Sequence, residues 1–499
     1  MRTLSKSKIL AYRQCAKRLW LEVHRPELRE DTAATQTSFA IGHQVGDIAR
    51  QIYDPELTGH LIDLQIEGFD AAFARSLELL EHRQPIFEAG FRANGALAFA
   101  DVLLPVAPDS WRMVEVKSST SVKDYHRDDI AVQTYIARSA GLPLTGIALA
   151  HIDNQWVYPG NADYQGLLVE EDLTAEAFAR HTEAATWIAE ASAVVANDAE
   201  PDICTGKHCS TPYECSFLTY CTSQEPQAEH PINWLPGKLG NALQTEIQKH
   251  GWRDLSEVPD ALLNARQQRV KAVTLSGEPY FDATGAAQAL ASHSLPAYFM
   301  DFETIQFAVP IWRGTRPYQQ ITFQFSVHTL NEAGELGQHA FLDLSGDDPS
   351  AAFAEALISA CGIAGPIYVY NAGFETARIR ELSERLPQFS DALLAINTRV
   401  VDLLPIAREF FYHPSQHGSW TIKKVLPAAC PELRYDDLTG VQDGGMAMTA
   451  FLEAISADTT AHRRAEIEEQ LLAYCALDTY ALVRLYEFYK RTRSTPAFD

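Results

Sequence analysis

Short apolar runs alternate with polar turns in two separate stretches of the chain, residues 84–160 and the part from Leu295 onward. In the first stretch, the runs PIFEAGF, LAFADVLL, RMVEVKSS and TGIALAHI are typical of strands. Between the last two, DDIAVQTYIARSAG has helical spacing and ends at Gly141. Helical spacing also covers residues 1–30 and the stretch from Leu173 to about Asn197. The N-terminal half is therefore expected to be an α/β domain.

The second stretch begins with AYFMDFET, QITFQFSVHT and QHAFLDL, which predict three successive strands. A fourth run, IYVYN, leads into the helical segment FETARIRELSERL, and residues 464–492 predict a long helix near the C-terminus. The intervening part, about 222–290, is rich in Pro, Gln and Glu at its start and helical afterwards. We therefore expect an N-terminal domain at 1–225, a helical connector at 226–290 and a second α/β domain at 291–499.

Composition places the chain among ordinary globular proteins, with 499 residues, 46% hydrophobic and 21% charged. No apolar run is long enough to span a bilayer, and the polar, basic N-terminal segment lacks the apolar core of a signal peptide. We therefore expect a cytoplasmic protein without a membrane partner. The net charge of −24 means that any binding to nucleic acid should be weak and salt-sensitive. In a reducing compartment the eight cysteines should ligate metal or be buried, rather than form disulfides.

Acidic residues recur on the strands and helices of the C-terminal domain. Asp301 and Glu303 are two apart on a strand, so they share a face, and Tyr474 and Asp478 are four apart on a helix. Glu375 follows the fourth strand, where a helix begins. Carboxylates that converge at one site would repel each other, and divalent cations remove that repulsion in phosphodiester hydrolysis. Asp402 also opens a predicted helix, where an N-cap is more typical than a metal ligand.

These motifs, DFET, NAGFE and YCALD, resemble in order those of the DEDD exonucleases, which include DnaQ-like proofreading subunits. SWTIKKVL also resembles a Ser-x-x-x-Lys turn found between the second and third motifs. The resemblance covers roughly residues 295–492 and implies an RNase H-like fold with 3′→5′ exonuclease activity. It implies that Tyr474 orients the attacking water, and that Glu375 stands where the family usually carries Asp. The implied ligands of Mg²⁺ or Mn²⁺ are Asp301, Glu303, Glu375 and Asp478.

A second acidic set lies in the N-terminal domain. Asp101 is on one predicted strand, and Glu115 and Lys117 share a face of the next. Two carboxylates can hold Mg²⁺, and a lysine can position water and offset phosphate charge. Glu88, on the strand before Asp101, could add a ligand, and Gln133 lies with Tyr135 on the following helix.

This set resembles the PD-(D/E)XK nucleases, in particular the RecB-like branch that includes CRISPR-associated exonucleases. The resemblance implies a restriction-endonuclease-like fold with Asp101, Glu115, Lys117 and Gln133 in the active site. That branch usually carries Gly-x-x-x-His with the histidine as a metal ligand. Here IGHQVGDIAR places Gly46 at the histidine position, counted from Gly42, and His43 is displaced by three residues.

Three cysteines, Cys209, Cys215 and Cys221, recur every six residues, without the tight pairs typical of zinc sites. In the RecB-like branch three such cysteines join one near the N-terminus to hold a [4Fe–4S] cluster, and Cys15 matches that position. The cluster would tie the first helix to the end of the domain. Cys204 competes as the fourth ligand, and zinc or unliganded thiols are the alternative interpretations.

As a whole, the chain resembles an uncharacterised bacterial family that fuses a RecB-like, cluster-bearing nuclease half to a DnaQ-like exonuclease half. The resemblance implies a metal-dependent nuclease that acts on single-stranded DNA or RNA in repair or defence. A nucleic-acid-binding clamp with one or both sites inactive is the alternative. The choice between DNA and RNA, and the oligomeric state, stay open.

Overall fold

The computed structural model describes residues 2–491, without the side chains of residues 33, 34 and 36. The chain forms two compact units, each with mixed α/β structure. Unit 1 comprises Met1–Pro226 and Phe307–Gln319, and unit 2 comprises Gln227–Gln306 and Gln320–Asp499. Within residues 2–491, no helix is both long enough and apolar enough to cross a bilayer.

Unit 1 is built on a seven-stranded mixed sheet. Its strands are β1 (Leu4–Ser5), β2 (His60–Leu61), β3 (Ile86–Ala93), β4 (Ala96–Val106), β5 (Ser110–Lys117), β6 (Leu144–Ile152) and β7 (Leu168–Asp172). Its helices are α1 (Lys6–Gln14), α2 (Ala16–His24), α3 (Ala33–Tyr53), α4 (Leu64–Glu67), α5 (Phe69–Leu79), α6 (Asp124–Ser139), α7 (Thr174–Ala179), α8 (His181–Ala196) and α9 (Leu218–Ser223).

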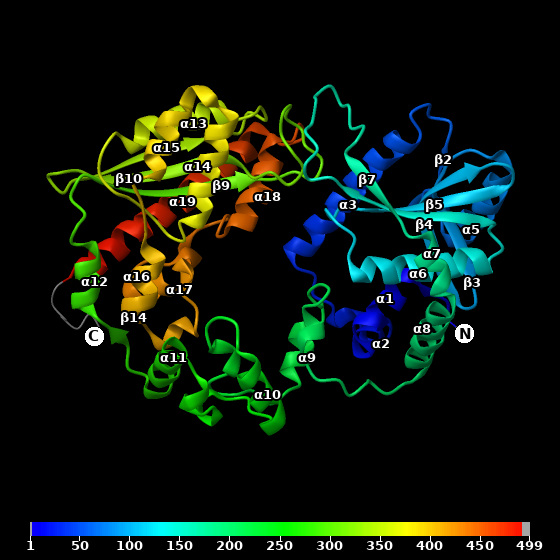
Figure 1. The fold of residues 1–499 in the computed structure, drawn as a ribbon, viewed down its shortest axis with the longest axis horizontal. Helices are drawn as coiled ribbons and strands as arrows, with labels where there is room; N and C mark the ends of the chain where they lie inside the picture. Colours follow the sequence, from blue (N-terminus) through cyan, green and yellow to red (C-terminus); the bar gives the residue numbers. More distant parts are fainter. Residues whose placement is uncertain (1, 492–499) are drawn as a thin grey trace. The chain divides into compact units, whose positions relative to one another are not determined.

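The strands of this sheet run in the order β2-β3-β4-β5-β6-β7, and β1 pairs with β4. Strands β3, β4 and β5 are antiparallel neighbours, whereas β6 is parallel to β5. A parallel neighbour requires a crossover connection, which α6 provides along one face of the sheet (Figure 1). The four main strands predicted from the apolar runs, and the helix between the last two, are thereby confirmed.

The sheet of unit 1 is covered on both faces because its apolar side chains alternate between them. Met113 and Leu149 face one side, where they share a core with Ile130 of α6. Val114 and Ala148 face the other side, beside Tyr53 of α3. The alternation of side chains along each strand therefore decides which residues are buried against which helix.

Two helical stretches of the N-terminal half are interrupted, so the prediction of one helix over residues 1–30 was wrong. The chain leaves the helix at Cys15, whose φ of −164° is extended, and α2 begins directly afterwards. The break turns Gln14 toward the cysteine-rich segment, where its Nε2 donates to the carbonyls of His208 and Tyr213 at 2.7 and 2.8 Å. The second stretch is likewise divided at Arg180, between α7 and α8.

Residues 307–319 fold as part of unit 1, although they lie inside the range expected for the C-terminal domain. The backbone N–H of Tyr158 donates to Thr315 O, and the N–H of Gly314 donates to Tyr158 O, each at 2.9 Å. Ala308 and Val309 share an apolar cluster with residues of β6 and the loop after it. Local apolar patterning gives no signal for this arrangement, because the contacts are long-range.

Unit 2 contains a five-stranded sheet and a small two-stranded sheet. Its strands are β8 (Tyr280–Phe281), β9 (Ala297–Ile305), β10 (Ile321–Leu330), β11 (Leu336–Leu342), β12 (Ile367–Val369), β13 (Val400–Asp402) and β14 (Phe411–Tyr412). Its helices are α10 (Asn241–His250), α11 (Ala265–Ser276), α12 (Ala283–Leu290), α13 (Ser350–Cys361), α14 (Gly373–Arg385), α15 (Ser390–Asn397), α16 (Leu403–Phe410), α17 (Ile422–Ala429), α18 (Gly444–Ile455) and α19 (Ala461–Lys490).

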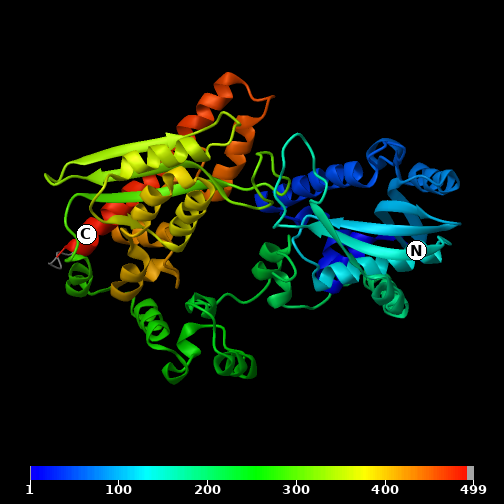
Figure 2. The same ribbon diagram turned by 45° about the horizontal axis from the view of Figure 1, so that its top comes forward.

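The larger sheet has the strand order β11-β10-β9-β12-β13. Strands β9, β10 and β11 are antiparallel neighbours, β12 is parallel to β9, and β13 is parallel to β12. Helices α13, α14 and α15 cover one face and α19 covers the other (Figure 1, and turned in Figure 2). The three strands, the strand–helix step and the long C-terminal helix predicted from the sequence are confirmed.

A buried polar network fixes the position of α19 on this sheet. Gln324 Nε2 of β10 donates to Leu471 O at 2.7 Å. Two turns further along α19, Thr479 Oγ1 pairs with Ser326 Oγ at 2.7 Å and with His328 Nδ1 at 2.8 Å. Buried polar groups cost free energy when they lack partners, so these contacts specify one register for the helix.

Removing the Thr479 hydroxyl should therefore destabilise unit 2. Thr479→Val keeps the shape but leaves Ser326 and His328 without their partner, so the free energy of unfolding should fall by about 1–3 kcal/mol in chemical denaturation. The matched control is Thr449→Val, because the exposed Thr449 hydroxyl bonds only to Gly445 O of its own helix. The control should change stability by less than about 0.5 kcal/mol, and equal losses in both variants would contradict the role of the network.

Candidate active sites

The acidic residues of unit 2 come together where β9 meets α19. Asp301 and Glu303 lie on β9, on the opposite face from Met300 and Phe302, which enter the core with α13. Asp478 lies on α19. Asp301, Glu303 and Asp478 each offer a carboxylate oxygen, and these oxygens all lie within 4.8 Å of one another. Three predicted site residues from a strand and a distant helix are thus brought into one group.

Glu375 reaches the same group from the first turn of α14. Its side chain is only 2% exposed, and its Oε2 has no hydrogen-bond partner among the described residues. The neighbouring Asp301 carboxyl interacts with it. A buried carboxylate oxygen that lacks a hydrogen-bond partner costs the protein free energy, and beside the carboxyl of Asp301 it is the kind of ligand that a hard divalent cation prefers.

Burial dominates the electrostatics of this site. It raises the pKa of Glu303 and of Glu375 to about 8, and that of Asp478 to about 6. The pKa of Asp301 is also raised well above its usual range, by burial and then by the charges of Asp478, Glu303 and Glu375. Positive charge placed between these carboxylates would reverse the shifts.

Two further residues belong to the site, and the sequence did not single them out as functional. Tyr435 donates its hydroxyl to Asp478 Oδ1 at 2.5 Å. Lys423 Nζ lies 5.3 Å from the centre of the Tyr435 ring and 5.5 Å from that of Tyr474, and its charge lowers the pKa of both Glu303 and Asp478. Lys423 is the lysine of the Ser-x-x-x-Lys turn, which was the available signal, whereas Tyr435 stands in no motif.

Asp402 is an N-cap in this structure. Its Oδ1 accepts from the backbone N–H of Leu404 at 2.9 Å, at the start of α16. Its carboxylate also accepts from Asn371 N at 2.9 Å and Ala372 N at 3.1 Å. Asp402 therefore holds the turn that leads into Glu375.

Glu88, Asp101, Glu115 and Lys117 line one cavity of about 820 Å³, whereas Gln133, also predicted for this site, is not among its lining residues. Asp101 comes from β4, Glu115 and Lys117 from β5, and Glu88 from β3. Asp101 Oδ2 accepts from the backbone N–H of Val116 at 2.7 Å, which fixes it beside the Glu115 strand. Because β3 and β4 are antiparallel, the pairs on either side, Phe87 with Val102 and Ala89 with Ala100, place Glu88 opposite Asp101.

Glu88 has a strained backbone, and burial raises the pKa values of both Glu88 and Asp101. Glu88 has a φ of 60°, a left-handed conformation that is uncommon for a residue other than Gly and clusters at functional sites. Burial, followed by the charge of Glu115, raises the pKa of Glu88 and raises the pKa of Asp101 to about 8. The buried Glu115 Oε2 has no hydrogen-bond partner among the described residues. Among the described residues, the group of three carboxylates whose oxygens converge within 4.8 Å is the one in unit 2, so any cation held by Glu88, Asp101 and Glu115 is a proposal.

Lys6 and Asp129 complete this site, and neither was predicted. Lys117 Nζ donates to Glu115 Oε1 and Asp129 Oδ2, each at 2.6 Å. Lys6 Nζ donates to Glu115 Oε1 at 2.7 Å and to Gln133 Oε1 at 2.9 Å. Lys6 lies about a hundred residues before Glu115 in sequence, so no local spacing could have indicated the contact.

Helix α3 forms another wall of the cavity, with Gly42, His43 and Gly46 among its lining residues. His43 is exposed and faces the cavity, so its displacement along the motif has not removed it from the site. A Cβ added at Gly46 would have no heavy atom within 4 Å. The position that the motif gives to histidine is therefore open space in this chain.

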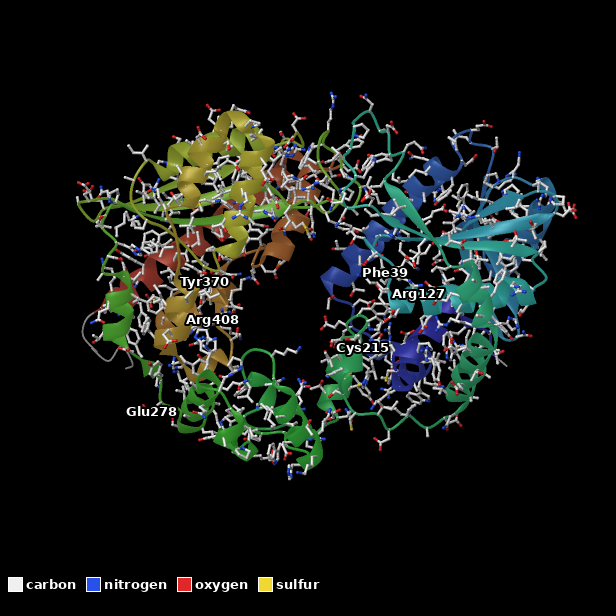
Figure 3. All side chains as sticks on the ribbon, in the orientation of Figure 1. Phe39, Arg127, Cys215, Glu278, Tyr370 and Arg408 are labelled. Carbon is white, nitrogen blue, oxygen red and sulfur yellow. The ribbon has the colours of Figure 1, made fainter. Side chains whose placement is uncertain are left out.

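Five cysteines line one small cavity between α2 and α9: Cys15, Cys204, Cys209, Cys215 and Cys221. Cys215 lies beside the N-terminal helices, in a cluster with Trp20 and Leu21 (Figure 3). Burial raises the pKa of Cys215 and raises that of Cys221 to about 11, and in both cases Cys209 and Cys15 add to the rise. Cys204 is exposed.

Cys361, Cys430 and Cys475 are buried in unit 2. Cys361 and Cys430 have elevated thiol pKa values because they are buried. None of the three is among the cysteines that line the cavity in unit 1.

The folds and sites together define a mixed α/β protein with two buried acidic sites and a cysteine cluster. A family described as a domain of unknown function, DUF2779, matches residues 298–421, a range that includes Asp301, Glu303 and Glu375 but ends before α19. No curated protein sequence matches the chain. Among solved structures, one titled "Crystal structure of SSO0001" is 13% identical, with a TM-score of 0.24, and the alignment covers 45% of this chain and 88% of that one.

The raised pKa values predict how metal and pH act together on stability. Burial raises the pKa of Glu303 from 4.5 to about 8. The folded protein therefore loses stability as the pH rises from 4.5 to about 8, because this buried carboxyl must then give up its proton. The metal-free protein should therefore melt at a lower temperature at pH 8 than at pH 6. Added Mn²⁺ should raise the melting temperature more at pH 8, because it binds the ionised carboxylates.

A substitution in unit 2 tests whether the pH-dependent stabilisation by Mn²⁺ arises at the Asp478 site. Asp478→Asn removes a repelling charge, so the metal-free variant should melt above the wild type at pH 8 and gain less from Mn²⁺. The matched control is Asp391→Asn, an exposed acidic residue on α15, which should behave as the wild type. A stabilisation by Mn²⁺ that is equal at both pH values and unaffected by Asp478→Asn would contradict a metal site at Asp478.

Proposed function

We propose that this chain is a metal-dependent nuclease and that unit 2 is a 3′→5′ exonuclease of the DnaQ-like kind. The observation that carries the proposal is the convergence of Asp301, Glu303 and Asp478, whose ligand oxygens lie within 4.8 Å of one another. These residues come from β9 and α19, which are far apart in sequence. Acidic groups that are collected and buried at such a cost to the protein support a cation-binding role.

The topology of unit 2 supports an RNase H-like fold for this site. Three antiparallel strands are followed by two parallel strands reached through helices, in the order β11-β10-β9-β12-β13. The first acidic motif lies on the central strand, the second at the start of α14, and the third on the last helix. This is the placement that the DFET, NAGFE and YCALD motifs lead one to expect.

Mg²⁺ or Mn²⁺ held by Asp301, Glu303, Glu375 and Asp478 would supply the Lewis acidity that phosphodiester hydrolysis requires. The protein's own groups would orient the reactants. The Tyr474 hydroxyl would orient the attacking water, and Tyr435 holds Asp478 in position through its 2.5 Å hydrogen bond. Lys423 Nζ is fixed by Gln442 O at 2.5 Å and provides positive charge for a phosphate.

Unit 1 is proposed to carry a second nuclease site, of the PD-(D/E)XK, RecB-like type. Its support is the shared cavity of Glu88, Asp101, Glu115 and Lys117, on three antiparallel strands followed by a crossover helix and a parallel strand. The carboxylates would hold Mg²⁺, and Lys117 would offset phosphate charge. Gln133 takes part through Lys6, because its Oε1 accepts from that ammonium group.

The cysteine cavity is proposed to hold a [4Fe–4S] cluster through Cys15, Cys209, Cys215 and Cys221. The thiols of Cys15 and Cys209 contribute to the raised pKa values of Cys215 and Cys221, whereas Cys204 is exposed and is not among those causes. The elevated thiol pKa values mean that metal binding would release protons. The cluster would join the α1–α2 corner to the end of unit 1.

The proposed substrate is single-stranded DNA or RNA, in repair or defence. The net charge of −24 favours weak binding governed by the local cations and the bound metal, in place of a broad basic surface. The alternative function is a nucleic-acid clamp with inactive sites, which the assays below separate from a nuclease.

The exonuclease assignment predicts mononucleotide release from the 3′ end of a labelled single strand by the full-length protein with Mn²⁺. Asp301→Ala and Asp478→Ala should each lower the rate about 10²–10³-fold or more, because each removes a metal ligand. Tyr474→Phe should be milder, at about tenfold, because only a hydroxyl is lost. Glu375→Asp should retain activity, whereas Glu375→Ala should be severely impaired.

The matched control for these variants is Asp391→Ala, which removes an exposed carboxylate from the same unit. It should cut at the wild-type rate. Mononucleotide release at the wild-type rate by Asp301→Ala would contradict the exonuclease assignment. If the wild type and all variants bind the strand but release no mononucleotides, the clamp function is favoured.

The cluster assignment predicts brown, anaerobically purified protein with about four irons per chain. Cys215→Ser and Cys15→Ser should both lose iron and lower the melting temperature of unit 1. Cys204→Ser serves as the matched control and should keep its iron, because Cys204 is the exposed cysteine at the edge of the cavity. Zinc without iron in the anaerobic protein would rule out the cluster, and iron loss only in Cys204→Ser would change the fourth ligand.

A further inference from the structure

Lys6 is the first residue of α1, and its side chain reaches the centre of the Glu115 site. Besides its bonds to Glu115 Oε1 and Gln133 Oε1, its Nζ lies 3.0 Å from Asp129 Oδ1. The Lys6 side chain is 18% exposed. Although burial acts to lower the pKa of Lys6, the charges of Asp129 and Glu115 outweigh it and raise the pKa. Lys6 is therefore a charged, interior member of the site.

The site of unit 1 is a closed ring of charges. Lys6 and Lys117 both contact Glu115 and Asp129, so two ammonium groups alternate with two carboxylates. Both lysines approach Oε1 of Glu115, which leaves the buried Oε2 without a partner. Gln133 is held by its own bond from Nε2 to Phe99 O at 3.0 Å, which directs its Oε1 toward Lys6. The lysines thereby set the orientation in which Glu115 can receive a cation.

The opposite end of α1 is Cys15, which follows Gln14 directly and closes the helix through its N–H bond to Ala11 O at 2.9 Å. The helix has nine residues, so it spans about 13 Å. Ile9 and Ala11 bury its middle in the core. At its start, β1 pairs with β4, and Leu4 N donates to Gly95 O at 2.9 Å. One short, packed helix thus joins the acidic site to the cysteine cavity.

We propose that Lys6 is a positioning residue of the Glu115 site and that α1 couples it to the cluster held by Cys15. This inference rests on the proposed nuclease site and cluster of unit 1. With the cluster in place, α1 holds Lys6 against Glu115, which orients that carboxylate and adds a positive charge to the site. Loss of the cluster frees the Cys15 end of α1 and lets Lys6 withdraw.

The charge of Lys6 predicts in which direction the Mn²⁺ affinity should change when Lys6 is replaced. Lys6 lies close to the carboxylates that would hold the cation, so removing its charge should strengthen Mn²⁺ binding. Cutting should weaken at the same time, because Glu115 is no longer held and less phosphate charge is offset. A residue with a merely structural role would not tighten metal binding while it slows the reaction.

The test uses full-length protein that carries Asp301→Ala and Asp478→Ala, so that only the unit 1 site reports. Mn²⁺ affinity is measured by electron paramagnetic resonance of free Mn²⁺. Lys6→Met should lower the Kd at least about fivefold and slow cutting at least about tenfold. The matched control is Lys8→Met on the same helix, whose ammonium contacts Glu22 Oε2 at 2.9 Å, away from the site. The control should match its parent in both measurements.

Coupling through α1 is tested by anaerobic removal of iron with a chelator. Iron removal should tighten Mn²⁺ binding in the parent but not in Lys6→Met, because the two changes have the same effect on the site. The reciprocal measurement starts from cluster-loaded protein and needs no stable iron-free form. Saturating Mn²⁺ should speed iron release from the parent and leave the rate unchanged in Lys6→Met.

The outcomes distinguish this inference from the proposals on which it rests. A parent that binds no Mn²⁺ overturns the unit 1 metal site and the role of Lys6 with it, and a parent without iron overturns the coupling. When Mn²⁺ and iron are both bound, an unchanged or higher Kd in Lys6→Met overturns the positioning role. Equal effects of iron removal in the parent and in Lys6→Met overturn the coupling alone.

Discussion

Burial of like charges is the constraint around which both units are arranged. In unit 2 the carboxylate oxygens of Asp301, Glu303 and Asp478 lie within 4.8 Å of one another, and in unit 1 Glu88, Asp101 and Glu115 line one cavity, so burial weakens the screening of these charges by water. Every such group must be protonated, paired or bound to a cation. The elements that carry these residues can therefore pack only if the charge is balanced, which links folding to the chemistry of the sites.

The two units balance this charge in different ways. In unit 1, Lys6 and Lys117 contact Glu115 and Asp129 directly, so the protein supplies its own cations. In unit 2, Lys423 moderates the pKa of Glu303 and Asp478, yet both values remain raised. Unit 1 can thus hold Glu115 and Asp129 in place before any cation arrives. Glu88 and Asp101 of unit 1 keep raised pKa values, as do the carboxylates of unit 2, so an added cation would stabilise both sites.

Polar contacts between distant elements place the functional side chains. Thr479 pairs with Ser326 and His328 and adjoins Asp478, so the same network that docks α19 brings the third acidic motif to β9. Asp402 acts similarly from α16, since it accepts from the backbone that leads to Glu375. In unit 1, the β1–α1 segment delivers Lys6 and ends at Cys15. In these segments, a residue that fixes the packing of an element stands next to a residue of the candidate site, as Thr479 does beside Asp478.

The sequence alone determined the local elements and most of the acidic residues. Apolar periodicity depends on which face of a strand or helix is buried, so the main strands, α6, α14 and α19 could be predicted. Spacing within one element likewise indicated the pairs Asp301 with Glu303 and Glu115 with Lys117. The tertiary structure alone decided the helix break at Cys15, the place of residues 307–319 in unit 1, and the recruitment of Lys6, Asp129 and Tyr435. Each of these depends on contacts between residues far apart in the chain, whose energies leave no periodic trace in the local sequence.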